Sequence, residues 1–335
     1  MDLLKRFDNK IIEKRIPVYC AFELTNRCNI KCRICFQNQP RNDELTTDEV
    51  KDILDQLADM GCLFLTITGG EPLLRKDFFE IIRYAVKKTF AITLKTNATL
   101  ITPTVAEKMN SLPFHRIHIS LLGATAKTHD KITGVEGSFE KVISAVKLLK
   151  KKSIITLATT VTKENICELN KMKLLADSLE VNWLSSALIY PRKDGGCSHL
   201  NARLADEDLK KYYSYLFKPY AKEIRESEEK AFLTCVAGVI DISITHIGEV
   251  TPCTCFPMIL GNLKESSLNE ILTSSAELKH LRSVSVRDLK ECSRCDYKLY
   301  CRRCPAMVYL ENNTVTDSSL ECCRHAKIIK EVIGK

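Results

Sequence analysis

The alternation of apolar and polar positions divides the first two thirds of the chain into strand-like and helix-like segments in turn. Short runs rich in β-branched residues favour strands, and apolar residues spaced three or four positions apart favour amphipathic helices. Strands are expected at 18–24, 62–68, 91–96, 115–121, 154–161 and 182–190, and helices at 47–60, 77–88, 103–111, 138–152, 164–178 and from 206 onward. Strands that alternate with helices predict an α/β fold with a parallel sheet.

Several of these helices carry end signals in the sequence. Thr46 or Thr47 is expected to cap the first helix, and Gly61 to stop it. Pro103 suits the first turn of the third helix, and Ser138 is expected to cap the fourth. These signals support the predicted boundaries.

Right-handed crossovers between parallel strands curl such a sheet toward a partial (β/α)6 barrel. Chemistry in barrels of this kind gathers at the carboxyl ends of the strands. The notable motifs fall there: 28–35 after the first strand, 69–72 after the second, 96–97 after the third, and Ser120 at the fourth. The sequence therefore predicts one active-site end.

After residue 205 the pattern changes. A highly charged segment at 223–230 is expected to form a helical link, and beyond Cys235 the chain breaks into short pieces with turn residues and cysteines. A small region of this kind is often held by metal. We expect two domains: a barrel domain at 1–225 and a small cysteine-rich α+β domain at 226–335.

Composition narrows the class of protein. The chain has 335 residues, 45% hydrophobic and 27% charged, which is typical of a globular protein. It has no apolar run of about 18 residues, and its charged start does not resemble a signal peptide. The net charge of +8 comes without a basic block interleaved with aromatics. We expect a cytoplasmic protein with no membrane or nucleic-acid partner.

Sixteen cysteines are the most informative part of the composition. Cytosolic cysteines rarely form disulfides, and clusters of them more often bind metal. Three lie between Cys28 and Cys35, and nine between Cys235 and Cys323. Cys20, Cys62 and Cys167 are expected to be packed thiols, and Cys197 to be a free loop thiol.

The first cysteine group is Cys28, Cys32 and Cys35, on the loop after the first strand. Thiolates are the usual ligands of iron–sulfur clusters. A cubane cluster has four irons, so three cysteines leave one iron able to bind a small chelating molecule. Structural zinc is the alternative, but it needs four ligands, and no fourth is obvious nearby.

The CxxxCxxC motif of 28–35, followed by Gly69-Gly70-Glu71-Pro72 after the second strand, resembles the radical S-adenosylmethionine (radical SAM) superfamily. The resemblance covers residues 18 to about 220. It implies a [4Fe–4S] cluster on Cys28, Cys32 and Cys35 whose open iron binds S-adenosylmethionine. Reductive cleavage of this cofactor would then produce a 5′-deoxyadenosyl radical that removes a substrate hydrogen.

The resemblance also implies which residues touch S-adenosylmethionine. Gly69 and Gly70 would let the backbone approach the methionine part, and Glu71 would accept a hydrogen bond from its amino group. Ile34 stands where the family usually has an aromatic residue against adenine, and Phe36 follows instead. The implied set is Ile34, Phe36, Gly69, Gly70, Glu71, Pro72, Asn97 and Ser120 (ribose or methionine carboxylate), and Val161 (adenine, through the backbone).

The C-terminal cysteines resemble the SPASM extension of that superfamily, except that Cys301 and Cys304 enclose two residues where the family has three. The resemblance implies two auxiliary [4Fe–4S] clusters. Cys292, Cys295 and Cys301 would hold the outer one with Cys322 or Cys323; Cys235, Cys253 and Cys304 would hold the inner one, with Cys255 or substrate as the fourth ligand. The alternatives are two zinc sites, or one auxiliary cluster with unliganded cysteines.

Segments 120–139 and 191–204 resemble SPASM peptide maturases. This implies modification of a ribosomally made peptide by a thioether or carbon–carbon crosslink, by epimerisation or by oxidation. The first strand starts near Val18, so we expect a separate leader-peptide-binding protein or a substrate without a leader. Asp130 and Arg192 lie in loops at the active-site end and are candidate substrate contacts.

Other functions remain open. The substrate could be a small molecule, as for an aminoglycoside epimerase or aminocyclitol dehydrogenase, or the chain could be an anaerobic sulfatase maturase. An iron–sulfur scaffold or electron carrier is the non-enzyme alternative, but it has no need of the Gly69–Pro72 motif. An enzyme of this class also needs an electron donor of the flavodoxin or ferredoxin type.

Overall fold

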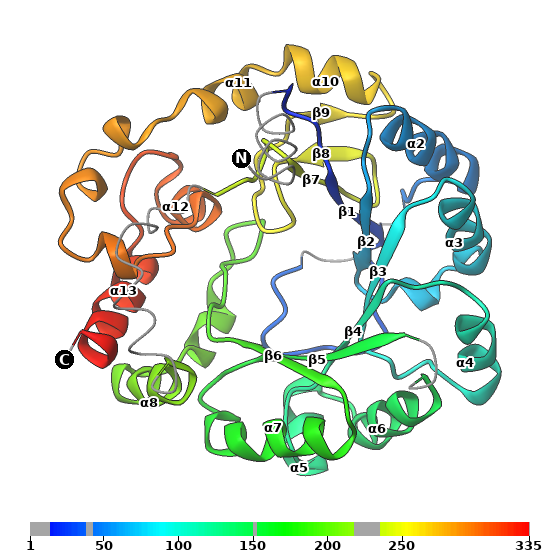
Figure 1. Cartoon of the computed structure of the whole chain (residues 1–335), viewed down its shortest axis with the longest axis horizontal. Helices are drawn as coiled ribbons and strands as arrows, with labels where there is room; N and C mark the ends of the chain where they lie inside the picture. The colour runs from blue at the N-terminus through cyan, green and yellow to red at the C-terminus, as the bar shows by residue number, and fades with distance from the viewer. Residues whose placement is uncertain (1–13, 38–42, 150–152, 218–234, 335) are drawn as a thin grey trace, which may run out of the picture.

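The computed structural model describes residues 14–37, 43–149, 153–217 and 235–334. The strands form an inner arc and most helices an outer ring (Figure 1). Six parallel strands follow one another in chain order through the sheet. They are β1 (Tyr19–Thr25), β2 (Phe64–Gly69), β3 (Ala91–Thr96), β4 (Arg116–Ser120), β5 (Ile154–Thr160) and β6 (Asn182–Ser186). The predicted partial barrel is confirmed, although β6 is shorter than expected.

The outer ring holds the predicted helices and one that was not predicted. The predicted ones are α2 (Thr47–Asp59), α3 (Phe78–Lys87), α4 (Pro103–Asn110), α6 (Ser138–Leu149), α7 (Leu169–Ser178) and α8 (Asp206–Phe217); the new one is α5 (Ala126–Thr133). The helix expected from residue 164 starts five residues late. The Asn165 side chain accepts from Thr162 N and donates to Leu122 O, which holds the chain in a turn before α7.

The helix-end signals agree with the structure at Thr46, Gly61 and Pro103 and fail at Ser138. Thr46 and Glu49 form a capping box at α2, and Gly61 takes a φ of 86° after it. At α6, however, the carboxylate of Asp130 accepts the N–H groups of Gly137 and Phe139 and the hydroxyl of Ser138. Asp130 therefore caps this helix, and the prediction for Ser138 was wrong.

Apolar and mostly polar residues alternate along each strand, so that the apolar side chains lie on one face of the sheet. Leu65, Ile92 and Ile117 are fully buried in the hydrophobic core against the helices. The alternate residues of the strands face the barrel interior and are mostly polar; Thr66 on β2 and Lys95 on β3 are examples. The core therefore lies between sheet and helices, and the interior of the barrel is left for polar side chains.

The cysteine-rich region continues the barrel sheet. The strand β7 (Asp241–Ile244) pairs in parallel with β1, and the antiparallel strands β8 (Glu249–Thr251) and β9 (Gly261–Asn262) complete a nine-stranded sheet. Four helices follow: α10 (Leu268–Ser274), α11 (Ala276–Ser283), α12 (Pro305–Asn312) and α13 (Leu320–Ile333). Phe256 and Ile328 belong to the same hydrophobic cluster as the barrel. Apolar packing thus supports this region in addition to its cysteines.

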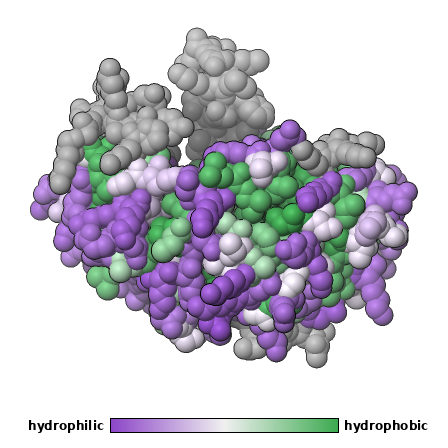
Figure 2. All heavy atoms as spheres, turned by 90° about the horizontal axis from the view of Figure 1, so that it is seen from below, coloured by the Kyte–Doolittle hydropathy of each residue, from purple (hydrophilic) through white to green (hydrophobic). Residues whose placement is uncertain are grey.

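The expected domain boundary at 225/226 and the charged link at 223–230 lie outside the described residues, so both stay predictions. Figure 2 shows one face of the molecule, where hydrophilic side chains surround smaller hydrophobic patches. No helix of the described ranges combines the length and the apolar character needed to cross a lipid bilayer.

Candidate active site and cysteine centres

Cys28, Cys32 and Cys35 lie on the loop that leaves the carboxyl end of β1. The thiols of Cys28 and Cys35 are exposed, and Cys32 is half-buried between them. Burial, together with the neighbouring Cys35 and Cys28 thiols, raises the pKa of Cys32 to about 12. The three thiols are thus close enough to repel one another when charged. A metal centre would relieve this repulsion by neutralising the thiolates.

The unpredicted helix α5 holds this loop in place. Lys31 N donates to Thr133 O at 3.1 Å, and Arg33 N donates to Ile132 O at 3.0 Å. Gly134 ends the helix with a φ of 72°, and a Cβ on it would lie 3.2 Å from Lys31 O. The sequence did carry a signal for α5, because Thr125 is a good N-cap and Gly134 a good C-terminal stop.

Gly69, the last residue of β2, and Gly70, which follows it, bring the end of β2 against the end of β1. Gly70 N donates to Thr25 O at 2.7 Å, and Glu71 N donates to Arg27 O at 2.8 Å. A Cβ on Gly69 would lie 2.2 Å from Thr25 O, and one on Gly70 would lie 2.2 Å from Arg27 O. Because Gly69 and Gly70 have no side chains, the two strand ends can approach this closely. The bond from Glu71 N then fixes the position of Arg27, the residue before Cys28. Pro72 is buried and opens a short 3-10 turn.

The carboxyl group of Glu71 joins the ends of β2 and β3. It is fully buried and accepts hydrogen bonds from Leu73 N at 3.1 Å, Thr96 Oγ1 at 2.8 Å and Asn97 N at 2.8 Å. Burial raises its pKa to about 7, against the effect of these bonds. The expected contact with the methionine amino group stays a prediction.

Asn97 extends this connection to the cysteine loop. Its Nδ2 donates to Asn29 Oδ1 at 3.0 Å and lies 3.7 Å from Cys28 Sγ. Its backbone is held by Glu71. The chain Glu71–Asn97–Cys28 therefore links the motif after β2 to the first thiol.

The remaining predicted cofactor residues lie at the same end of the barrel but make no contact that tests their roles. Ser120 ends β4 half-buried, and Ile34 and Phe36 flank Cys35 half-buried. Val161 is fully buried, and its N–H donates to Ser186 O at 2.8 Å. Their contacts with ribose or adenine stay predictions.

A second group of thiols consists of Cys235, Cys253, Cys255 and Cys304. Burial and the nearby Cys255 and Cys304 thiols raise the pKa of Cys253. Burial also raises the pKa of Cys255 to about 11, and Cys304 contributes to this. Tyr190, after β6, donates its hydroxyl to Cys304 Sγ at 3.5 Å. Cys255, whose role the sequence left open, thus lies with the inner set.

A third group of thiols lines a single pocket. Its cysteines are Cys292, Cys295, Cys301 and Cys323. Cys322 is buried and lines a different pocket, beside Tyr213 and His325. The structure therefore brings Cys323 into the outer set, although the Cys322 thiol also lies near Cys301 and raises its pKa.

The three groups consist of thiols, which suits iron–sulfur ligation. Within the described ranges, no three His, Cys, Asp or Glu side chains have the geometry to hold a single metal ion. Of the other cysteines, Cys20 and Cys62 are buried as expected, whereas Cys167 is exposed, so its assignment as a packed thiol was wrong. Cys197 is exposed on its loop.

The loop after β6 is tied to the barrel interior, which the sequence did not indicate. Lys193 Nζ lies 2.8 Å from Glu23 Oε1, and both side chains are largely buried. Gln37, just beyond the cysteine loop, donates to the same oxygen at 2.9 Å. Glu23 on β1 therefore connects the cysteine loop with the loop after β6.

The two candidate substrate contacts differ in their surroundings. Asp130 is occupied in capping α6. Arg192, on the loop after β6, has a buried Nε without a hydrogen-bond partner in the described residues.

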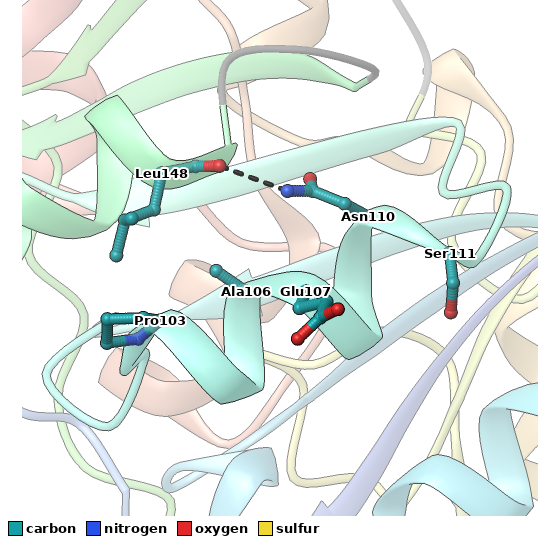
Figure 3. A pocket seen from close by; sticks show the side chains of 6 residues that line it. All are labelled: Pro103, Ala106, Glu107, Asn110, Ser111 and Leu148. Atoms are coloured by element: carbon teal, nitrogen blue, oxygen red, sulfur yellow. Dashed lines mark hydrogen bonds between the residues drawn. The ribbon is translucent and has the colours of Figure 1, made fainter.

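A surface pocket of about 370 Å³ lies elsewhere, between α4 and α6 on the outside of the barrel (Figure 3). Asn110 Nδ2 donates to Leu148 O at 3.0 Å across it. It contains none of the cysteines or strand ends described above.

Comparison with known proteins agrees with this site. The profile of the radical SAM superfamily matches residues 22–176, and that of an iron–sulfur cluster-binding domain, SPASM, matches residues 235–305. The chain belongs to the radical SAM superfamily and carries a C-terminal SPASM domain. It is a radical SAM enzyme, whose family uses a [4Fe–4S] cluster and S-adenosylmethionine.

The chain is similar to relatives that differ in function. The chain is 29% identical to the AdoMet-dependent heme synthase of Methanosarcina barkeri, over 91% of this chain and 96% of that protein. It is also 29% identical to the subtilosin biosynthesis protein AlbA of Bacillus subtilis, over 86% of this chain and 67% of that protein. The crystal structure of Streptococcus suis SuiB with its precursor peptide SuiA has a TM-score of 0.75 at 18% identity, covering 95% of this chain and 80% of that one; this likeness shows a shared fold.

Proposed function

We propose that Cys28, Cys32 and Cys35 bind the catalytic [4Fe–4S] cluster, and that S-adenosylmethionine binds beside Gly69–Glu71. The observation that carries this proposal is the convergence of three thiols, a glycine pair and Asn97 at one end of the sheet. When bound, the cluster and cofactor would supply one-electron reduction and a radical that abstracts hydrogen. Glu71 and Asn97 would keep the loops of β1, β2 and β3 in register.

We further propose that the two C-terminal sets hold auxiliary iron–sulfur clusters. Cys235, Cys253, Cys255 and Cys304 would form the inner one, and Cys292, Cys295, Cys301 and Cys323 the outer one. Four thiols in each set leave no protein ligand missing. Two such centres suit an oxidation, because hydrogen abstraction must be followed by removal of a second electron. A flavodoxin or ferredoxin in a reducing cytoplasm is the proposed electron source.

The substrate proposal starts from the extent of the sequence matches. Similarity to the heme synthase runs nearly end to end in both chains, so we propose a heme precursor as the first candidate substrate. A ribosomally made peptide is the second candidate. It is supported by the similarity to AlbA and by segments 120–139 and 191–204.

The reaction class is tested on anaerobically reconstituted protein. We expect reductant-dependent 5′-deoxyadenosine and about twelve irons per chain, four for each cluster. Replacing Cys28, Cys32 and Cys35 by alanine should abolish 5′-deoxyadenosine and remove about four irons, while the C-terminal iron stays. Cleavage by this variant would show that the catalytic cluster lies elsewhere. Zinc in place of iron, without any cleavage, would favour a structural or scaffold protein.

The substrate is tested with the same preparation. Heme formation from a precursor porphyrin, followed by its absorbance, would support the first candidate. If no porphyrin is consumed and a co-expressed precursor peptide changes mass, the second candidate is favoured.

A further inference from the structure

Three basic side chains lie together on the inner face of the barrel. Lys95 on β3 and His118 on β4 are register partners in adjacent parallel strands, and Arg116 opposes Thr93 two pairs earlier. Their strand neighbours Leu94 and Ile117 are fully buried against the helices. Because side chains alternate along a strand, the three basic groups all point into the barrel.

These groups make no direct ion pair with an acidic side chain of the described residues. Lys95 is exposed and makes neither a hydrogen bond nor an ion pair there. The Nε atom of Arg116 and the Nε2 atom of His118 are buried without a hydrogen-bond partner. A buried polar group left without a hydrogen-bond partner is unfavourable. Burial, followed by the charges of Lys95 and Arg116, lowers the pKa of His118 to about 4.

The acidic groups of the barrel interior do not bind these basic side chains directly. Glu23 on β1 is paired with Lys193 and Gln37. Asp241 starts β7; burial raises its pKa to about 6, and the charge of Lys95 opposes this without a direct ion pair. Within the described residues Lys95 and Arg116 thus make no direct ion pair, which leaves a place for a negative group beside them.

The position of Lys95 relates this cluster to the cysteine loop after β1. Lys95 is followed in the chain by Thr96 and Asn97, and Asn97 Nδ2 lies 3.7 Å from Cys28 Sγ. An anion held at Lys95 would thus lie near the end of β3 that contacts this loop.

We propose that Lys95, with His118 and Arg116, binds a carboxylate of the substrate and orients it below the catalytic cysteines. This deepens the proposed function and rests on it, because it assigns a substrate group to the same barrel. A carboxylate accepts charge-assisted hydrogen bonds from lysine and arginine. Heme precursors carry carboxylates and so do acidic peptides, so the test includes one probe of each kind.

The test measures binding to the anaerobic holoenzyme by fluorescence anisotropy. The probes are coproporphyrin, a porphyrin with four carboxylates, and a rhodamine-labelled tetraglutamate peptide. We expect at least one probe to bind the wild type, and Lys95→Met to weaken that binding tenfold or more. Lys95→Arg should bind within threefold of the wild type. Which probe binds distinguishes the two sources of the carboxylate.

The matched control is Lys87→Met, which removes an exposed lysine from the outer helix α3 and should leave binding unchanged. Equal affinity of Lys95→Met and wild type would overturn the proposal, and so would a wild type that binds neither probe. 5′-Deoxyadenosine formed without substrate is measured on the same samples. Its loss would count against the proposed function, whereas its retention with lost probe binding isolates the role of Lys95.

Discussion

Replacing Glu71 by glutamine tests whether its buried carboxylate organises the active-site end. Each carboxylate oxygen faces a backbone N–H: Leu73 N at Oε1 and Asn97 N at Oε2. An amide has one acceptor oxygen and one NH2 group, so in either orientation a donor would face a donor. The Thr96 hydroxyl now donates between the two oxygens. Turning it would not remove the conflict, because the conflict lies between the new NH2 group and a backbone N–H.

The expected cost is one charge-assisted hydrogen bond and one unsatisfied buried N–H, about 2–4 kcal/mol. For a chain of this length that corresponds to a fall in Tm of roughly 3–6 °C. The assay is best run at pH 8, since the pKa of Glu71 is about 7 and the carboxylate is then mostly ionised. We also expect 5′-deoxyadenosine formation to fall at least tenfold, because Asn97 would lose its anchor beside Cys28.

Glu270→Gln is the matched control. Glu270 accepts from Ser267 N and Ser267 Oγ at 2.8 Å in the capping box that opens α10, in the cysteine-rich region. It should lower Tm by a smaller amount, because this carboxylate is exposed, and it should keep cofactor cleavage. If Glu71→Gln unfolds at the wild-type temperature with wild-type cleavage, the carboxylate does not hold the two strand ends together.

Four further variants test three separate parts of the structure. Cys323→Ser should remove the iron of the outer auxiliary cluster, whereas Cys322→Ser should keep it, because Cys323 lines the pocket of the other three thiols; iron counting that finds the reverse would exchange the two roles. Gly70→Ala should abolish 5′-deoxyadenosine formation, since its Cβ would lie 2.2 Å from Arg27 O, and normal cleavage would show that the loop can move at little cost. Thr46→Ala should reduce the free energy of unfolding by about 1 kcal/mol through loss of the capping box at α2, which denaturant unfolding measures; an unchanged midpoint would contradict the role of the cap.

The order of the six strands and the grouping of Cys28, Cys32 and Cys35 on one loop could be predicted from the sequence because both are local patterns. The alternation of apolar and polar residues along a strand indicates which of its faces is buried, and this does not depend on which strands pair with it. The spacing from Cys28 to Cys35 places three thiols on one loop without reference to the rest of the chain. The same holds for the cap at Thr46 and the stop at Gly61.

The roles of Cys322, Cys323 and Asp130 depend on tertiary contacts. Cys322 and Cys323 are sequence neighbours, but consecutive residues of helix α13 point about 100° apart, so only the packing of the helix selects one of them. Asp130 was a plausible substrate contact from its loop position, yet the start of α6 folds back onto its carboxylate. Both outcomes depend on the orientation of an element, which the local sequence does not encode.

The sequence by itself determined the barrel class, the group of three cysteines after the first strand and the presence of a second cysteine-rich region, because strand alternation and cysteine spacing act over a few residues. Only the tertiary structure showed that β7 extends the barrel sheet, that α5 supports the cluster loop, and that Lys95 and His118 are register partners. Each of these depends on hydrogen bonds between segments far apart in the chain, whose pairing is settled by the packing of the whole molecule.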